Sequence, residues 1–159
     1  MVRLGLDNGK RVEESLITFR VEREKELALS KEVKVGCVIE GWKKAKAGTI
    51  YETYEYFGSA NIEISSSFVY HAEMIALTDC IMHRFYPIRI FVSSQSKEEN
   101  VLLCGSCRQL LLEVNSDCEV IVLNPDGTRK HNETITVHDT IPNHKDVIDK
   151  NQKFLELLS

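Results

Sequence analysis

Two short patterns in the chain carry residue types that can hold a metal ion and move a proton. The first is His71–Glu73, a His-x-Glu pattern, and the second is Cys104–Cys107, a Cys-x-x-Cys pattern. A shuffled chain of this composition would contain His-x-Glu about 0.5 times, but Cys-x-x-Cys only about 0.12 times. The cysteine pair is therefore the stronger evidence for a metal site, and the histidine supports that site only in combination with the pair.

The two patterns together predict a zinc site of the catalytic type. Backbone N–H groups at a helix start stabilise thiolates, and Gly105 permits a tight chain path around an ion. Two thiolates and one imidazole suit Zn²⁺ and leave its fourth tetrahedral position for water, whose pKa falls from about 15.7 to about 7. We expect His71, Cys104 and Cys107 to be the metal ligands and Glu73 to carry the proton.

Other interpretations of the same residues stay open. The cysteine pair also fits a redox dithiol of the thioredoxin type, but that interpretation leaves His71 and Glu73 without a role. A structural zinc site needs a fourth ligand, for which Cys80, His83 and Cys118 are the candidates. His71 taken alone fits a surface or core imidazole.

Apolar periodicity places these motifs at the starts of two helices in an α/β domain that spans residues 1–159. The first expected helix, Val12–Leu29, has Val12, Leu16, Phe19 and Leu27 on its apolar side. We then expect a β-hairpin at Val33–Gly41 and Ile50–Gly58, and a helix that starts near His71 after the signal at Ser65–Ser67 and is stopped by Pro87. The remaining expected elements are a strand at Ile88–Ser93, a helix from about Gly105 to Val114, a strand at Glu119–Leu123 closed by a turn at Asn124–Gly127, a strand at Thr134–Val137 and a helix at Asp146–Leu158. This order predicts a mixed sheet covered by helices.

Composition narrows the functional classes. The chain has 159 residues, of which 43% are hydrophobic and 28% charged, and its formal net charge is −4. These values fit one ordinary domain and supply no strong positive field for nucleic acid or an anionic membrane. Residues 1–20 lack a signal-peptide core, and no stretch reaches the roughly 18 apolar residues of a membrane span. We expect a cytoplasmic protein in which Cys37, Cys80 and Cys118 are buried as reduced thiols.

The motifs resemble those of the cytidine deaminase family of zinc-dependent nucleoside deaminases, whose signature is His-x-Glu followed by Pro-Cys-x-x-Cys. The matching stretches are Ala60–Glu63, His71–Glu73 and Cys104–Gln109, and the last of these, CGSCRQ, is the most specific. Their order and spacing extend the resemblance from about Val12 to Pro142. The resemblance implies a three-layer α/β/α sandwich around a five-stranded mixed sheet.

The resemblance also implies an activity and a division of roles. Zinc held by His71, Cys104 and Cys107 would support deamination of cytidine or deoxycytidine to the uridine product and ammonia. Glu73 would move protons to the ring nitrogen and then to the leaving amino group. Asn61 and Glu63 would bind the sugar hydroxyls; Asn-x-Glu alone is expected about 0.9 times by chance, so its weight comes from its position before the histidine. Short members of the family form homotetramers, so we expect a homotetramer or homodimer with a nucleoside substrate and no nucleic-acid or membrane partner.

Several positions depart from the family pattern and bear on the substrate. Leu103 stands in place of a proline, Val33 in place of a phenylalanine that packs on the pyrimidine, and no phenylalanine closely follows Pro142. Phe68, Tyr70 or Phe154 can supply an aromatic face instead, or belong to the core. Arg108 is either a hydrogen-bond donor to the cysteine sulfurs or an exposed helical arginine. A modified nucleoside or another aminated heterocycle therefore remains an alternative substrate.

Two further alternatives come from other functional classes. A polynucleotide deaminase shares the zinc chemistry but needs a basic groove with stacking platforms, whereas the lysines and arginines here are scattered. A non-catalytic zinc-binding relative that acts by association has no use for Glu73 beside the metal.

Overall fold

The computed structural model describes residues 11–31, 33–44, 52–65, 68–95 and 103–141, together with Leu158. The predicted helix Asp146–Leu158 therefore lies outside the described residues, apart from Leu158. The elements in chain order are α1 (Glu14–Glu26), β1 (Val35–Lys43), β2 (Thr53–Ala60), β3 (Ile62–Ser65), β4 (Phe68–Tyr70), α2 (Ala72–Met82), β5 (Tyr86–Ser94), α3 (Gly105–Val114), β6 (Glu119–Leu123), β7 (Ile135–Thr136) and a 3₁₀ turn, η2 (His138–Thr140).

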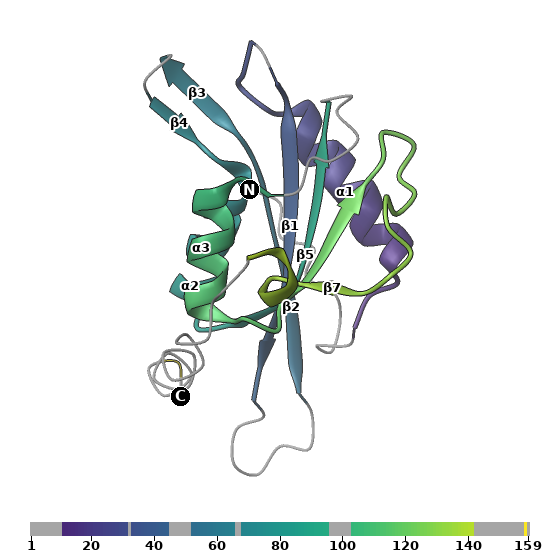
Figure 1. The fold of residues 1–159 in the computed structure, drawn as a ribbon, viewed down its shortest axis with the longest axis vertical. Coiled ribbons are helices and arrows are strands. Elements are labelled where there is room, and N and C mark those ends of the chain that lie inside the picture. Colours follow the sequence, from purple (N-terminus) through teal and green to yellow (C-terminus); the bar gives the residue numbers. More distant parts are fainter. Residues whose placement is uncertain are drawn as a thin grey trace.

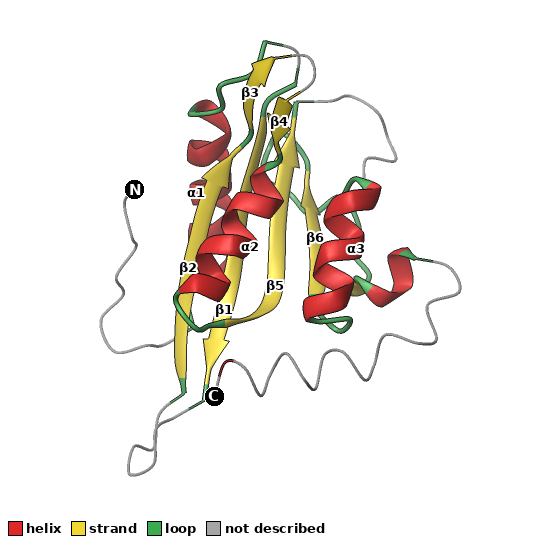
Figure 2. Ribbon diagram, turned by 90° about the vertical axis from the view of Figure 1, so that its left-hand side faces the viewer, coloured by secondary structure: helices red, strands yellow, loops and turns green. Residues whose placement is uncertain are grey.

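Five strands form one mixed sheet in the order β2-β1-β5-β6-β7. Strands β5 and β6 run parallel, and the other neighbouring pairs are antiparallel. Helices α2 and α3 lie on one face of the sheet and α1 lies on the other (Figures 1 and 2). The predicted three-layer α/β/α sandwich and its five-stranded mixed sheet are confirmed.

Strand β1 shows how the sheet supplies both layers of the core. Its inner residues alternate, because successive side chains of a strand point to opposite faces. Cys37 and Ile39 pack with α2 and α3, whereas Val38 packs with α1. Every residue of this run is fully buried, which is why it appears in the sequence as a continuous apolar stretch.

Helix α1 buries a different face from the one that the sequence pattern predicted. Leu16, Phe19 and Leu27 are exposed, and the helix packs on the sheet through Ile17 and Val21. The same face buries two cations that are hydrogen-bonded. These are Arg20, which donates to the Tyr56 carbonyl, and Lys25, which donates to the Ser93 hydroxyl. The apolar periodicity predicted the wrong buried face, because charged residues usually mark the solvent-exposed side of a helix. Here Arg20 and Lys25 are buried and have hydrogen-bond partners within the protein.

The predicted start of α2 near His71 is confirmed, but its end differs from the prediction. Between β2 and this start, Ser65 ends β3 in an unpredicted hairpin with β4. Pro87 does not stop the helix. The helix ends at Met82, Arg84 adopts a positive φ of 62°, and Pro87 lies within β5 opposite Gly41.

Glu40 forms a charged cluster inside the layer between the sheet and α1. Its carboxylate is fully buried and accepts hydrogen bonds from the Nε of Arg89, from the Nε of Arg11 at 3.1 Å and from the Tyr56 hydroxyl at 2.9 Å. Burial by itself raises the pKa of Glu40, but the hydrogen bonds from Arg89 and Arg11 outweigh it and hold that pKa below its usual value. A lone acid in the apolar run VGCVIEGW was the sequence signal for such a cluster.

Cys37, Cys80 and Cys118 are fully buried in the core beneath α2 and α3, as predicted. All five cysteines of the chain have free thiols. Within the described part of the chain, no helix combines the length and the apolar character that a membrane crossing requires.

Candidate metal centre

His71 occupies the position immediately before α2. It has extended backbone, with φ −72° and ψ 140°, and its carbonyl accepts the first hydrogen bond of the helix from the Ile75 N–H at 3.2 Å. The buried Ser59 hydroxyl of β2 donates to the carbonyl of Ala72 and so ties the first turn of the helix to the sheet. The strand and the helix together fix the backbone from which the imidazole projects.

Cys104 occupies the equivalent position before α3. Its carbonyl accepts from the Arg108 N–H at 3.0 Å, and its sulfur accepts from the Cys107 N–H at 3.4 Å. Leu103, which replaces the proline of the family pattern, is buried in the core and anchors the segment leading into the helix. The predicted placement of the cysteine pair at a helix N-terminus is confirmed.

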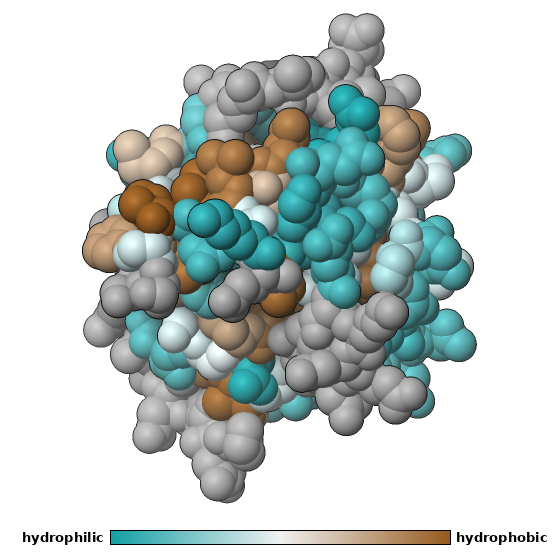
Figure 3. Space-filling view, turned by 90° about the horizontal axis from the view of Figure 1, so that it is seen from above, coloured by the Kyte–Doolittle hydropathy of each residue, from teal (hydrophilic) through white to brown (hydrophobic). Residues whose placement is uncertain are grey.

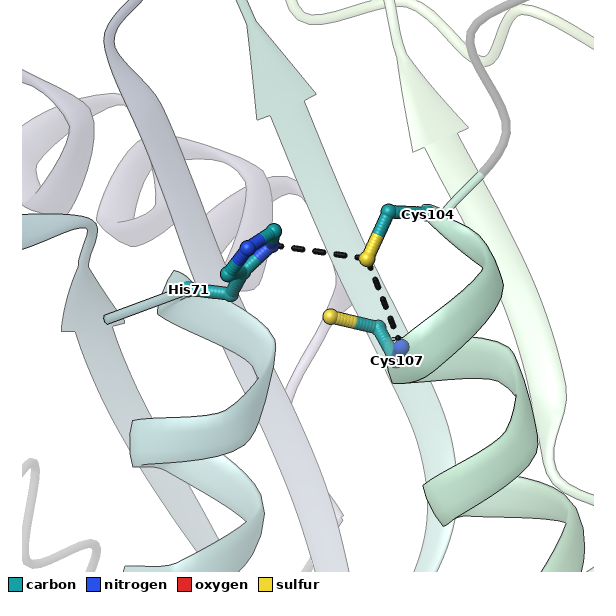
Figure 4. A group of neighbouring side chains, drawn as sticks. All are labelled: His71, Cys104 and Cys107. Carbon is teal, nitrogen blue, oxygen red and sulfur yellow. Dashed lines mark hydrogen bonds between the residues drawn. The ribbon is translucent and has the colours of Figure 1, made fainter. Parts of the chain in front are cut away.

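The two helix starts bring the predicted ligands together. A ring nitrogen of His71 and the sulfurs of Cys104 and Cys107 all lie within 4.8 Å of one another, and Figure 4 shows the three side chains converging. The His71 Nδ1 lies 3.4 Å from the Cys104 sulfur. Zinc bonds of about 2.3 Å to sulfur and about 2.05 Å to nitrogen, at a tetrahedral angle, separate the two ligand atoms by about 3.6 Å. The donor types and their spacing therefore fit Zn²⁺.

Two opposing electrostatic effects act on the cysteine thiols of the site. Two helices, α2 and α3, direct their N-termini to this place, and each N-terminus carries a partial positive charge that stabilises a thiolate. Burial, followed by the charge of Glu73, raises the pKa of the Cys107 thiol. A bound divalent cation would reverse the preference of Cys107 for its protonated form, because a thiol that coordinates a metal ion loses its proton.

No fourth protein ligand completes the cluster among the described residues. The group of His, Cys, Asp and Glu side chains close enough to share an ion contains only His71, Cys104 and Cys107. Cys80, His83 and Cys118, the candidates for a structural site, are not part of it. His83 follows the far end of α2 and contacts Asp79. Three protein ligands are typical of catalytic rather than structural zinc.

Glu73 lies next to this cluster without belonging to it. It is in the first turn of α2 and is 6% exposed. Burial raises its pKa, and its own backbone N–H, the nearby His71 and a hydrogen bond with Cys107 partly oppose this increase. A buried carboxylate in contact with a ligand but outside the ligand group can exchange protons with a substrate held there.

Asn61 connects β2 to β3 and is almost fully buried. Its side-chain oxygen accepts from the Val35 N–H at 2.9 Å, and its side-chain nitrogen donates to the Val33 carbonyl at 2.8 Å. The amide therefore fixes the start of β1. Its contact with a sugar hydroxyl stays a prediction. The side-chain amide of Asn61 retains one N–H and one oxygen lone pair that can make such a contact.

Glu63 lies two residues further on, in β3. Its Oε2 accepts from the Ser30 hydroxyl at 2.8 Å. No sequence pattern links the two residues, because 33 positions separate them, so sequence reasoning missed Ser30. The predicted role of Glu63 in sugar binding also stays a prediction.

Two of the three aromatic candidates for a base clamp, Phe68 and Tyr70, do not belong to the core. Phe68 and Tyr70 are 55% and 46% exposed, and their rings pack edge to face at 5.5 Å. In the β3–β4 hairpin Glu63 pairs with Val69, and Ile62 pairs with Tyr70. Paired residues share a face and neighbours alternate, so the two aromatic rings lie on the face opposite Glu63. Phe154, the third candidate, is outside the described residues.

Arg108 was predicted either to donate to the cysteine sulfurs or to be exposed on its helix. It is half-buried, and its hydrogen bond goes to neither sulfur. Its Nη1 donates to the Thr140 carbonyl at 2.6 Å, so the guanidinium ties α3 to η2.

Comparison with known proteins agrees with this architecture. No protein-family model matches the chain. Among solved structures, the cytidine deaminase from Burkholderia pseudomallei is 19% identical with a TM-score of 0.63, over 83% of this chain and 98% of that one. The Mycobacterium leprae enzyme is 15% identical with a TM-score of 0.59, over 84% of this chain and 100% of that one. The enzyme from Bacillus anthracis is 13% identical with a TM-score of 0.59, over 90% and 98%. This chain has the cytidine deaminase fold.

Proposed function

We propose that this chain is a zinc-dependent hydrolase that converts cytidine, deoxycytidine or a closely related aminopyrimidine nucleoside into the uridine product and ammonia. One observation carries the proposal. An imidazole and two thiols converge at the N-termini of two helices, and a buried carboxylate lies beside them outside the ligand group. The shared fold with cytidine deaminases supports the same reaction class.

His71, Cys104 and Cys107 would hold the zinc ion, which supplies Lewis-acid activation of water at neutral pH. Glu73 would take one proton from the water that attacks the amino-bearing carbon of the base and deliver it to the ring nitrogen. It would then carry the second proton of that water from the new hydroxyl group to the amino group. The carbonyl forms as the carbon–nitrogen bond breaks, so one water is consumed and one ammonia is released. Because Glu73 is buried, bulk solvent does not compete for these protons.

Asn61 and Glu63 bind the sugar hydroxyls in this proposal. Both belong to the segment that leads into the hairpin before His71. This arrangement lets one continuous stretch hold the sugar and place the base at the metal. A free base lacks these contacts, so we expect cytosine to be a poor substrate.

We also propose that the protein works as a homotetramer or homodimer in the cytoplasm. Exposed apolar side chains gather at the end of the molecule that carries the β3–β4 hairpin (Figure 3). They are Leu27, Leu29, Val33, Ile64, Phe68, Val69 and Tyr70. A cluster of this kind marks an interaction surface, and a second copy of the chain is the proposed partner. Five free thiols suit a reducing compartment.

The test is a deamination assay on the purified, zinc-loaded protein. Cytidine, deoxycytidine, cytosine and a single-stranded oligonucleotide are followed by the ultraviolet change on deamination. We expect conversion of the two nucleosides, and a decrease of about 10²-fold or more in kcat for Glu73→Ala with the zinc content unchanged. Glu26→Ala, at an exposed position on α1, is the matched control and should keep full activity.

Each contrary outcome has a definite meaning. Conversion of the oligonucleotide alone would identify a polynucleotide deaminase. Full activity of Glu73→Ala would remove the carboxylate from the mechanism. Stoichiometric zinc without conversion of either nucleoside would favour a non-catalytic relative or a deaminase of a different heterocycle.

A further inference from the structure

The turn after α1 is fastened to the segment that contains Asn61 and Glu63. The Leu29 N–H donates to the Asn61 carbonyl at 3.1 Å, and the Glu63 N–H donates to the Leu29 carbonyl at 2.9 Å. Ser30, the next residue, donates its hydroxyl to the Oε2 of Glu63 at 2.8 Å. Two backbone bonds therefore hold the position of the segment, and one side-chain bond holds the orientation of the Glu63 carboxylate.

Asn61 and Glu63 differ in what they leave available to a ligand. Both polar atoms of the Asn61 side chain are bonded to the backbone at the start of β1. Glu63 uses Oε2 for Ser30, and within the described part of the chain its Oε1 has no hydrogen-bond partner. An ionised carboxylate accepts through both oxygens, so Oε1 retains its full capacity for a hydroxyl donor. Glu63 is also the only charged member of the pair, and hydrogen bonds to charged groups are the stronger ones.

We propose that Ser30 is a positioning residue that orients the Glu63 carboxylate, so that Glu63 Oε1 binds a sugar hydroxyl of the substrate. This inference rests on the proposed nucleoside function and deepens it. Glu63 carries the recognition of the hydroxyl, and Asn61 mainly holds the backbone around it. Ser30 is half-buried and touches the substrate only through Glu63, so its removal weakens substrate binding without slowing proton transfer at the base.

The test compares Ser30→Ala with the wild type on cytidine and on 2′,3′-dideoxycytidine. We expect KM for cytidine to rise about threefold to tenfold, the value of one hydrogen bond, while kcat stays within about twofold. KM for the dideoxynucleoside should not change, because that substrate lacks the hydroxyls that Glu63 would bind. Ser30→Thr retains a hydroxyl and should restore most of the affinity. Ser65→Ala, in the same hairpin, is the control and should behave as the wild type.

A double-mutant cycle and a binding measurement separate positioning from general damage. In a Glu63→Ala background, Ser30→Ala should add no further rise in KM, because the two residues act as one unit. Calorimetric titration with uridine should show the same loss of affinity in Ser30→Ala as the rise in KM for cytidine. If Ser30→Ala lowers kcat, or raises KM equally for both nucleosides, the positioning role is wrong while the proposed function stands. If the wild type neither converts cytidine nor binds uridine, both proposals fail.

Discussion

Replacing Arg89 by methionine removes the most buried cation from a carboxylate that solvent cannot reach. Glu40 is fully buried, and Arg89 is its partner from the neighbouring strand β5. The variant leaves Glu40 with the Tyr56 hydroxyl and with Arg11, whose side chain is 53% exposed. Breaking a buried ion pair by removing one partner costs about 3–5 kcal/mol. Because the hydrogen bonds from Tyr56 and Arg11 remain, we expect a loss near the lower limit, about 3 kcal/mol.

Urea denaturation at fixed protein concentration measures this loss. With a typical urea m-value of about 2 kcal/mol/M, a loss of about 3 kcal/mol lowers the midpoint by about 1.5 M. Arg11→Met removes a largely solvent-screened partner and should cost about 1 kcal/mol or less. The double variant Glu40→Gln with Arg89→Met leaves no buried charge and should be more stable than Arg89→Met alone.

The same pair predicts the pH dependence. Hydrogen bonds from Arg89 and Arg11 hold the pKa of Glu40 below its usual value. The stabilisation is therefore complete above the unfolded-state pKa of a glutamate, about 4.3, and is lost as pH falls through the lower folded-state pKa. The difference between wild type and Arg89→Met should be full at pH 7 and should shrink in this acidic range. A loss below about 1 kcal/mol at pH 7, or an equal loss at pH 7 and pH 3, would refute this account of the cluster.

Two further predictions use matched pairs. A Cβ at Gly36 would lie 2.6 Å from the backbone nitrogen of Lys25, so Gly36→Ala should lower the free energy of unfolding by about 1–3 kcal/mol. A Cβ at Gly105 would meet no atom within 4 Å, and Gly105 has no positive φ, so the chain path at the cysteine pair does not require the glycine that the sequence suggested. Gly105→Ala should therefore leave both stability and zinc content unchanged. Thermal unfolding with metal analysis decides this, and equal stability of the two variants would contradict it. Asn61→Leu loses the hydrogen bonds with the backbone of Val33 and Val35 and should lower the free energy of unfolding, measured in urea, by about 2 kcal/mol. Glu63→Gln should lower it by less than about 1 kcal/mol. The reverse order would show that Glu63, not Asn61, holds the segment together.

The sequence predicted the three candidate ligands from their residue types and from the local spacing of the cysteine pair; their role in binding zinc stays a prediction. The Cys104–Cys107 spacing places two sulfurs on the first turn of one helix, and a helix start also suits His71. The contact between His71 and Cys104 spans 33 positions and was expected only because both residue types suit one ion. No such chemical match pointed to the contact between Ser30 and Glu63, which also spans 33 positions. The bond between Ser30 and Glu63 depends on the pairing of a turn with β3, and that pairing is decided by the whole fold.

The elements of the fold were likewise predicted correctly where local pattern decides them and wrongly where contacts with distant residues do. Strand β6 was predicted with its observed bounds, because a short apolar run between polar residues has one simple interpretation. The buried face of α1 was predicted wrongly, because Arg20 and Lys25 find hydrogen-bond partners inside that a single helix does not reveal. The sequence analysis does not predict the β3–β4 hairpin, because Ser65 also fits a helix-start signal. The signal for two short strands is the alternation of the apolar residues Ile62, Ile64, Phe68 and Tyr70 on either side of it.

The proposed function requires that His71, Cys104 and Cys107 hold one zinc ion with an open position. X-ray absorption at the zinc edge, on protein purified without chelators and quantified by elemental analysis, tests this requirement. We expect one zinc per chain with two sulfur ligands at about 2.3 Å and two nitrogen or oxygen ligands at about 2.0–2.1 Å. We expect Cys107→Ser to lose that zinc and Cys118→Ser to retain it. Protein that contains no stoichiometric metal, or zinc bound by four sulfurs, would contradict this requirement.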